Sequence, residues 1–251
     1  MKRILLGTIA PIAIAMIFTG AAYAENASGP SATASAGYAF GLNRHLSNIY
    51  GSNATVQIPF DASWAKQFGF EALGGYHRPD SGQMDFWYLG GALYAGDDAG
   101  RVAANYTYHN IAGVGVHLYG AGGEWFVAPN LNLAVHGGGV TWDHGHGDGG
   151  YVGAQGTWYV GPDFALSGNF DYWSAAYNQS SETVQAEWLP SEYTPVSVYT
   201  GYQHINQTGS SFIFAGVKLY LNDGGAAALV DRQRNDTNGY IIESPKYLDQ
   251  F

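Results

Sequence analysis

The chain has 251 residues, a formal net charge of −10 at pH 7 and only 12% charged residues. Nucleic acid is excluded as a partner, because its phosphates are bound by basic patches and acidic residues here outnumber basic ones. The lack of cysteine excludes a disulfide framework, a metal–thiolate site and thiol chemistry.

Residues 1–24 are predicted to be a signal peptide. Lys2 and Arg3 form a charged start, residues 4–20 form an apolar run, and Ala-Tyr-Ala at 22–24 is a typical cleavage site. An uncleaved membrane anchor is the alternative, but Pro11 interrupts the apolar run. Removing the two basic residues leaves 8 Lys+Arg against 20 Asp+Glu, a formal charge of −12.

The composition of the remaining chain is unusual for a water-soluble domain. Charged residues are about half as common as usual, while aromatic residues reach 15% and there are 36 glycines. Only helices and closed β-barrels can span lipid, and no apolar run of about 18 residues follows residue 24. The composition therefore predicts a membrane-spanning barrel.

Alternation of apolar and polar residues marks the strands of this barrel. Val152, Ala154 and Trp158 share one face of their segment, and Gln155 and Thr157 share the other. Segments of about ten residues match tilted strands that cross a bilayer. The predicted strands are 35–42, 54–60, 68–77, 84–95, 101–109, 113–127, 130–142, 150–160, 164–174, 182–189, 195–204 and 210–221. The fold class is thus all-β, an antiparallel up-and-down transmembrane β-barrel with twelve strands; ten strands is the alternative.

The predicted connections differ in length between the two ends of the barrel. Residues 96–100, 128–130 and 161–163 are short, whereas 143–150 and 204–210 are longer and polar. Outer-membrane barrels combine short periplasmic turns with longer external loops. The short connections are therefore assigned to the periplasm.

A 33-residue repeat places tryptophans at equivalent heights. Residues 120–133 align with 153–166, and a weaker copy starts at Val184. The period-two alternation within the repeat excludes a helical repeat such as ankyrin. Tryptophans just before short turns predict a girdle at the membrane interface, with packing in a soluble sheet as the alternative. The predicted girdle is Trp125, Trp158 and Trp188.

Charged and amide side chains are expected on the inner face, because a charge facing lipid near the midplane costs about 2–4 kcal/mol. Acids outnumber bases there, which indicates a cation-leaning channel lining; an ion-pair network that fills a narrow lumen is the alternative. Glu124 belongs to this face as well, and Asp85 is added with ambiguous parity. The predicted lining is Glu71, Arg101, Asn105, Asn169, Asp171, Gln185, Glu187 and Lys218.

The hairpin at residues 122–139 illustrates the inside-out pattern. Val116 and Leu118, in its first strand, share the parity of Glu124, so a bulge near residues 120–123 is expected to turn these two side chains towards lipid. In its second strand, the predicted lipid face is Leu131, Leu133 and Val135, and the predicted lumen face is Asn132 and His136.

The glycine-rich loop 143–150 is a weak candidate for a metal site. His144 and His146 stand between aspartates, and imidazole with carboxylate suits divalent transition metals. The many glycines imply no preorganised geometry, so a polar loop tip is the preferred interpretation. No metal or other cofactor is predicted.

Three histidines fall at predicted external strand ends. His77, His109 and His204 could form a ring that titrates near pH 6, although amphipathic rim residues are the preferred interpretation. His204 with Ser210 or Ser211 also provides a base near a hydroxyl, but no third orienting group accompanies the pair. No enzyme activity is predicted.

The final strand carries the most specific resemblance. Residues 214–221, "FAGVKLYL", resemble the signal that the barrel-assembly machinery reads, with Gly216, Leu219 and Leu221 in matching positions and Phe214 where the signal has a polar residue. On this basis the chain resembles the porin-like outer-membrane β-barrel proteins of Gram-negative bacteria. The resemblance covers about residues 33–221 and implies residence in outer-membrane lipid and passive diffusion of small solutes. The predicted barrel domain is assigned to residues 25–222.

The tail at residues 223–251 breaks the alternation and is predicted to lie in the periplasm. It gathers Asp231, Arg232, Arg234, Asp236 and Glu243, and is interpreted either as a poorly ordered terminus or as a contact with peptidoglycan or a periplasmic partner. Two functional alternatives to a channel stay open: a closed-lumen structural or surface-binding outer-membrane protein, and a secreted soluble β-sandwich that binds a ligand.

Overall fold

The structure, a computed structural model, describes residues 31–43, 47–60, 67–81, 85–143, 147–174, 178–221 and 227–235. The predicted signal peptide and most of the predicted tail lie outside these residues. No helix within the described ranges is long and apolar enough to span a membrane.

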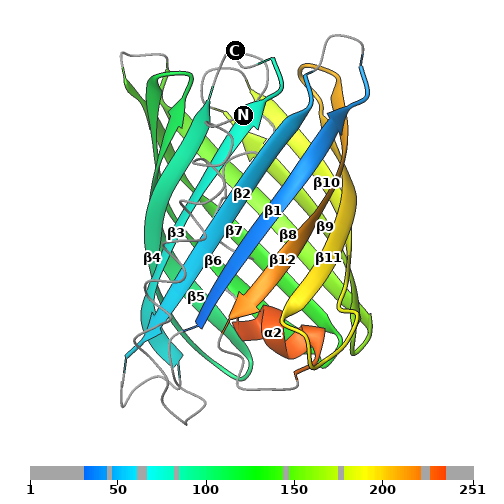
Figure 1. Cartoon of the computed structure of the whole chain (residues 1–251). Helices are drawn as coiled ribbons and strands as arrows, with labels where there is room; N and C mark the ends of the chain where they lie inside the picture. The colour runs from blue at the N-terminus through cyan, green and yellow to red at the C-terminus, as the bar shows by residue number, and fades with distance from the viewer. Residues whose placement is uncertain are drawn as a thin grey trace.

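Twelve antiparallel strands form one closed barrel, which confirms the predicted fold class (Figure 1). Each strand pairs with its neighbours in sequence, and β1 closes the ring by pairing with β12 from Ala32↔Leu221 to Gly41↔Phe212. Closure leaves no unpaired sheet edge. The strands are β1 (Ser31–Gly41), β2 (Ile49–Pro59), β3 (Gln67–Pro79), β4 (Phe86–Asp97), β5 (Gly100–Ile111), β6 (Val114–Ala128), β7 (Leu131–Trp142), β8 (Gly149–Gly161), β9 (Phe164–Trp173), β10 (Gln179–Trp188), β11 (Val196–Ile205) and β12 (Ser210–Leu221).

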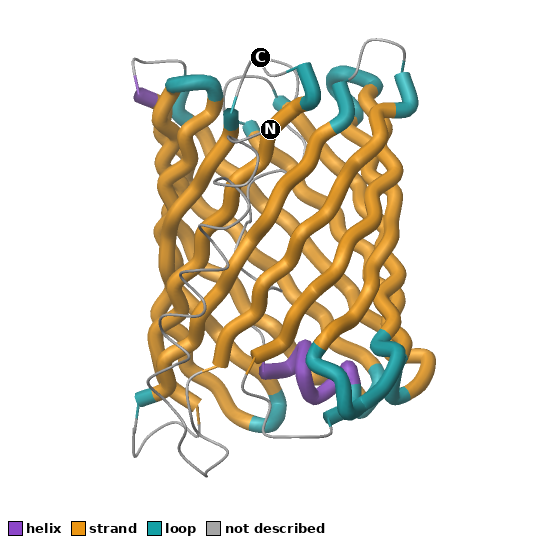
Figure 2. The backbone as a smooth tube through the Cα atoms, in the orientation of Figure 1, coloured by secondary structure: helices purple, strands orange, loops and turns teal. Residues whose placement is uncertain are grey.

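The two ends of the barrel differ, as Figure 2 shows. At the short-turn end, two residues each connect β4 to β5, β6 to β7 and β8 to β9. The helix α2 (Leu229–Asn235) also lies at the short-turn end. The opposite end, which we call the long-loop end, carries most of the longer connections. The short-turn end corresponds to the predicted periplasmic side.

Side chains alternate between the two faces of the wall. In β4, Leu89 and Leu93 are exposed on the outside, while Tyr88 and Ala92 are buried on the inside. The same alternation in β7 places Leu133 outward and Asn132 and His136 inward, as the hairpin pattern predicts. The barrel therefore has a largely apolar outer surface, and its inner face holds most of the charged side chains of the described strands.

The predicted bulge near residues 120–123 is wrong. Ala112 and Gly113 connect β5 to β6 with φ values of 54° and 89°, which suit a two-residue type I′ turn. That turn sets an uninterrupted register from Ile111↔Val114 to Gly100↔Trp125, so Val116 and Leu118 face inward with Glu124. The register of β6 shifts only against β7, between Phe126 and Ala128.

Candidate functional site: the inner face of the barrel

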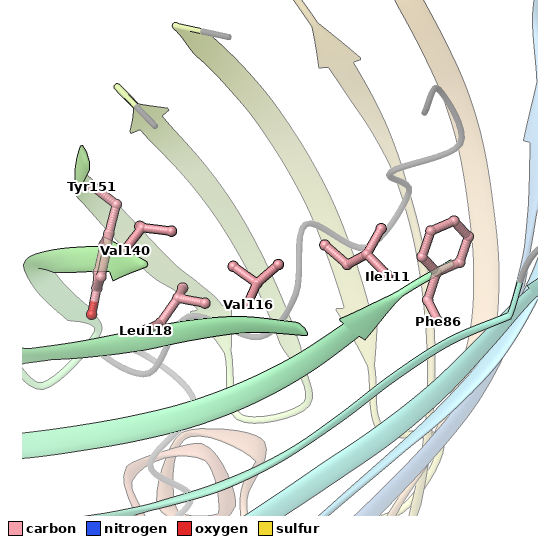
Figure 3. Close-up of a cluster of buried hydrophobic side chains, with 6 residues drawn as sticks. All are labelled: Phe86, Ile111, Val116, Leu118, Val140 and Tyr151. Carbon is pink, nitrogen blue, oxygen red and sulfur yellow. The ribbon is translucent and has the colours of Figure 1, made fainter. Parts of the chain in front are cut away.

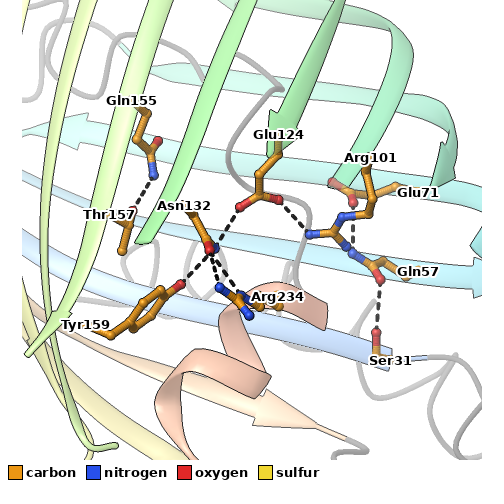
Figure 4. A network of polar contacts seen from close by, with 10 residues as sticks. All are labelled: Ser31, Gln57, Glu71, Arg101, Glu124, Asn132, Gln155, Thr157, Tyr159 and Arg234. Atoms are coloured by element: carbon orange, nitrogen blue, oxygen red, sulfur yellow. Dashed lines mark hydrogen bonds and ion pairs between the residues drawn. The ribbon is translucent and has the colours of Figure 1, made fainter. Parts of the chain in front are cut away.

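A polar network crosses four strands near the short-turn end (Figure 4). Arg101 on β5 donates through Nη2 to Oε2 of Glu124 on β6 at 2.8 Å, and both side chains are buried. Asn132 on β7 donates to Glu124 Oε1 at 3.1 Å and to the Tyr159 hydroxyl on β8 at 3.1 Å. The network holds a buried carboxylate between a guanidinium and an amide, so its charge is paired and hydrogen-bonded.

A second contact lies on the adjoining wall. Gln57 on β2 donates to Oε2 of Glu71 on β3 at 3.2 Å, and Glu71 is almost fully buried. Ser31 donates in turn to the Gln57 amide oxygen at 3.4 Å. The structure thus places Glu71 on the inner face and in contact with amide and hydroxyl groups.

Glu187 is the centre of a third polar group, on the other side of the barrel. Its Oε1 accepts hydrogen bonds from the Ser197 hydroxyl at 2.5 Å and from the Tyr220 hydroxyl at 2.6 Å. The Lys218 amino group stands 4.9 Å from the centroid of the Tyr220 ring. Glu187 and Lys218 therefore both lie on the inner face, close to the short-turn end.

The middle of the wall carries a histidine–aspartate pair. His136 Nε2 and Asp171 Oδ1 are 2.8 Å apart, and Asn169 donates to Asp171 Oδ2 at 2.8 Å. Gly153, on the strand between them, makes room for this pair, because a Cβ there would lie 2.1 Å from both His136 Nε2 and Asp171 Oδ1. Asn105 and Gln185 also fall on inward positions of their strands.

Apolar side chains gather on the inner face towards the long-loop end, which the period-two pattern does not anticipate (Figure 3). Val116 and Leu118 belong to this cluster, and the partly buried Trp142 and Trp173 pack against it. A strict separation of apolar-out from polar-in is therefore wrong for this part of the barrel. The buried members are Phe86, Ile111, Val116, Leu118, Val140 and Tyr151.

The three histidines at strand ends do not form a ring. His77 and His109 lie on the inner face and stack on either side of Tyr88, with ring centroids 6.3 Å and 5.3 Å from it. His204 faces outward on β11, and its Nδ1 lies 2.9 Å from the Ser211 hydroxyl. Alternate residues of a strand face opposite sides of the wall, and His204 occupies an outward position of β11, whereas His77 and His109 occupy inward positions of their strands.

The His204–Ser211 contact gains no orienting carboxylate among the described residues. Glu182 on β10 stands opposite His204 in the strand register, but its carboxylate accepts a hydrogen bond from the Asn206 side-chain amide at 3.3 Å. The Ser211 hydroxyl is also 2.9 Å from the Tyr202 hydroxyl. A base next to a hydroxyl without an orienting group is a weak basis for nucleophilic catalysis.

Asp85 is the one residue of the predicted inner face that lies elsewhere. It precedes β4, is half exposed and forms an ion pair with Nε of Arg78 at 3.4 Å. Its parity is that of Trp87, which is exposed on the outside of β4. Asp85 therefore belongs to the outer rim at the long-loop end.

The predicted girdle residues share one position. Trp125, Trp158 and Trp188 all face outward near the short-turn end, with 48%, 50% and 50% of their surface exposed. Exposed aromatic residues also occur on the outer face towards the long-loop end, among them Trp87 and Tyr202. Two aromatic belts separated by apolar residues are the arrangement that a bilayer favours.

The residues of the predicted assembly signal lie on β12. Leu219 and Leu221 face outward, and Gly216 faces inward, where Tyr199 packs so closely that a Cβ would lie 2.4 Å from its hydroxyl. This placement is compatible with the signal, whose recognition stays a prediction.

The candidate metal ligands His144 and His146 lie outside the described residues. Among the described residues, no group of three His, Cys, Asp or Glu side chains could hold a metal ion. The flanking Asp143 and Asp148 are engaged locally: Asp143 lies 3.3 Å from His117 Nε2, and Asp148 accepts from the Trp142 amide at 3.3 Å.

Several residues of the inner face escape prediction from sequence. Gln57, Tyr159 and Ser197 hold the buried carboxylates or their partners, and α2 contributes Gln233 and Arg234. Parity could have identified the strand residues once each register was known. Nothing in the local sequence of α2 indicates that it contacts residues about 100 positions earlier.

Comparison with known proteins found no matching family model and no matching curated protein. Solved structures do match the fold. The KdgM porin in complex with disordered oligogalacturonate aligns with a TM-score of 0.54 at 8% identity, covering 74% of this chain and 98% of that chain. The NanC porin aligns with a TM-score of 0.55 at 12% identity, covering 75% and 98%.

An outer membrane channel from Pseudomonas putida F1 aligns similarly, with a TM-score of 0.55 at 6% identity over 79% of this chain and 97% of that chain. All three identities are too low to transfer a substrate or a site residue. What this chain shares with each of these structures, over nearly the whole length of each of them, is the path of the backbone. This chain therefore has the closed β-barrel fold of the outer-membrane porins and channels.

Proposed function

We propose that this protein is an outer-membrane channel for passive diffusion of small solutes, with a preference for neutral and cationic ones. The observation that carries the proposal is a closed twelve-strand barrel whose outer face is largely apolar between two aromatic belts and whose inner face holds most of the charged side chains of the described strands. Residues 1–24 would direct export, and the final strand with Gly216, Leu219 and Leu221 would be read by the barrel-assembly machinery.

The charge of the inner face supports the choice of solute. Its described strand residues include four carboxylates, whereas the basic ones are Arg101 and Lys218, and Arg101 is paired with Glu124. Rings of acidic side chains favour cations, and basic ones favour anions. One matching structure is the KdgM porin in complex with disordered oligogalacturonate, which is an anionic oligosaccharide. We infer that this inner face is less suited to such a solute. The four carboxylates are Glu71, Glu124, Asp171 and Glu187.

A closed-lumen structural or surface-binding protein is the second candidate, and the burial of the inner face favours it. Glu71, His109, Val140 and Phe212 each have at most 1% of their surface exposed. Side chains that pack against one another in a barrel of this size can reduce the aqueous path. Conductance separates the two candidates.

The channel predicts ion currents in planar bilayers, with a reversal potential in a KCl gradient that indicates preference for K⁺. Asp171→Asn should move that potential towards zero, because it removes an inward carboxylate. Glu182→Gln is the matched control: it removes the same charge from the outer face one residue beyond the strand partner of Asp171, and should leave the potential unchanged. Protein that inserts, as shown by a heat-modifiable shift on semi-native gels, but stays silent in every variant would overturn the channel in favour of the closed-lumen protein.

A further inference from the structure

The helix α2 is packed into the short-turn end of the barrel, so residues 229–235 do not fit the interpretation of a poorly ordered tail. Most of the remaining tail lies outside the described residues. Leu229 at its start is fully buried. It belongs to one apolar cluster with Leu189, which follows β10, and with inward-facing residues of three strands. These residues are Tyr159 on β8, Ala165 on β9 and Tyr220 on β12.

Polar contacts hold the first turn of α2 to two connections of the barrel. The Leu229 amide donates to the Pro162 carbonyl at 2.7 Å, in the β8–β9 turn. Arg232 donates through Nη2 to the Glu192 carbonyl at 2.9 Å, in the β10–β11 connection, and its guanidinium carbon lies 5.8 Å from the Tyr220 ring centroid. Arg232 is almost fully buried by these contacts.

The other end of α2 reaches the opposite wall. Arg234 donates to Asn132 Oδ1 from Nε at 3.0 Å and from Nη2 at 2.9 Å, and Nη2 also lies 2.6 Å from the Ala128 carbonyl oxygen. Its guanidinium carbon is 4.8 Å from the Phe126 ring centroid. Figure 4 shows this arginine reaching from the helix towards Asn132. Together with the Leu229 cluster, these contacts run from β6 to β12.

The helix also changes the charge of this end. Arg234 and Glu124 are joined through one amide, because Asn132 accepts from the arginine and donates to the carboxylate. Gln233 donates to Oε2 of Glu187 at 2.9 Å. The acidic residue of the helix, Asp231, is exposed. The basic Arg234 thus approaches Glu124 through the Asn132 amide, and the neutral Gln233 contacts Glu187, whereas the acid of the helix is exposed.

Such a helix can be released without unfolding the wall. Seven residues are too few to form a stable isolated helix, so α2 depends on its docking contacts. Those contacts are side-chain and turn hydrogen bonds with one buried leucine, whereas every strand is held by a ladder on both sides. Local opening therefore costs less than opening of the barrel.

We propose that α2 is a tethered plug of the short-turn end. When docked, it narrows the solute path, and Arg234 offsets the charge of Glu124. When released, it leaves a wider and more cation-selective path. This inference rests on the proposed channel function, and it assigns to the C-terminal region the control of conductance and ion selectivity. It differs from a fixed constriction because it requires two positions of the helix.

Single substitutions in the full-length protein separate the effect of the helix on the width of the path from the effect of its charge on ion selectivity. Leu229→Ser removes the apolar anchor without adding charge, and should raise single-channel conductance about twofold or more as the path widens. Arg234→Gln should shift the reversal potential further towards that of K⁺. Asp231→Asn is the matched control on the same helix, because its side chain is exposed, and it should leave the conductance unchanged.

A reversible lock tests whether movement is required. The natural chain has no cysteine, so Leu229→Cys with Ala165→Cys introduces the only two thiols, both within the buried cluster. Joined by a short thiol-specific cross-linker that reducing agent cleaves, the double variant should conduct no more than the unsubstituted protein. Reduction should raise its conductance to the level of Leu229→Ser. The two single-cysteine variants should not respond to the cross-linker.

Conductance of these three forms tells failure of the plug from failure of the channel. Equal conductance of the unsubstituted, locked and Leu229→Ser proteins would overturn the plug while leaving the channel intact. Inserted protein that stays silent in all three forms would overturn the channel and the plug together. Silence of the unsubstituted protein with conduction by Leu229→Ser would support a plug that closes the path completely.

Discussion

Val184→Arg is expected to destabilise the inserted barrel by about 2–4 kcal/mol, because it places a charge on the lipid face near the bilayer midplane. Val184 lies at the middle of β10 and is well exposed on the outer face. Its cross-strand partners, Gly168 and Tyr202, are both uncharged, and the outward carboxylate of Glu182 lies two residues along the same strand. Urea-induced unfolding in lipid vesicles measures the loss in the free energy of unfolding.

The adjacent residue provides the matched control. Gln185→Arg introduces the same side chain one position along β10, where it faces inward among polar groups. Its effect on the free energy of unfolding should be small, although it should shift ion selectivity away from cations. Equal destabilisation by the two variants would contradict the assignment of the outer face to lipid, and would favour a water-soluble barrel.

Arg101→Met is expected to cost about 3–5 kcal/mol of folding free energy, because it leaves the buried carboxylate of Glu124 without its guanidinium partner. The two side chains meet at 2.8 Å, with 2% and 8% of their surface exposed. The Asn132 amide still donates to Glu124, but an amide does not neutralise a buried charge. Unfolding in urea again provides the measurement.

The double variant Arg101→Met/Glu124→Met decides whether the charge is the cause. Removing both partners should recover most of the lost stability, since an apolar pair of similar volume often replaces a buried ion pair at little cost. Persistence of the full loss in the double variant would show that Arg101 acts through packing, for example against the Phe126 ring 5.6 Å away. Position 101 would then matter for shape rather than for charge.

Val184 and Gln185 test which face meets lipid, and the Arg101–Glu124 pair tests the polar network at the short-turn end. That network continues through Asn132 to Arg234 of α2, so loss of Glu124 should also weaken the docking of the helix. A Glu124 variant is therefore expected to show both a less stable barrel and, because α2 docks less firmly, a higher conductance.

The sequence by itself determined the architecture, because the two faces of a barrel wall meet different environments, lipid outside and the polar lumen inside. Lipid selects apolar side chains and the inner face tolerates polar ones, so each strand carries a period of two that can be counted without any tertiary contact. This is why twelve strands and the outward position of Trp125, Trp158 and Trp188 were predictable. The inward positions of Glu71, Asp171 and Glu187 follow from the same alternation.

Tertiary structure decided what the period-two pattern leaves open. The type I′ turn at Ala112 and Gly113 sets the register that turns Val116 and Leu118 inward, and such a turn is not specified by apolar alternation. Parity alone does not say which inward residues meet, so the contacts of Glu187 required the closed ring.

The position of α2 depended on the tertiary structure most of all. Its seven residues carry no helical periodicity long enough to detect, and Arg234 meets Asn132 across 102 positions of sequence. That contact exists only because closure of the barrel brings β6 to β12 around one opening, which gives a short helix enough partners to dock.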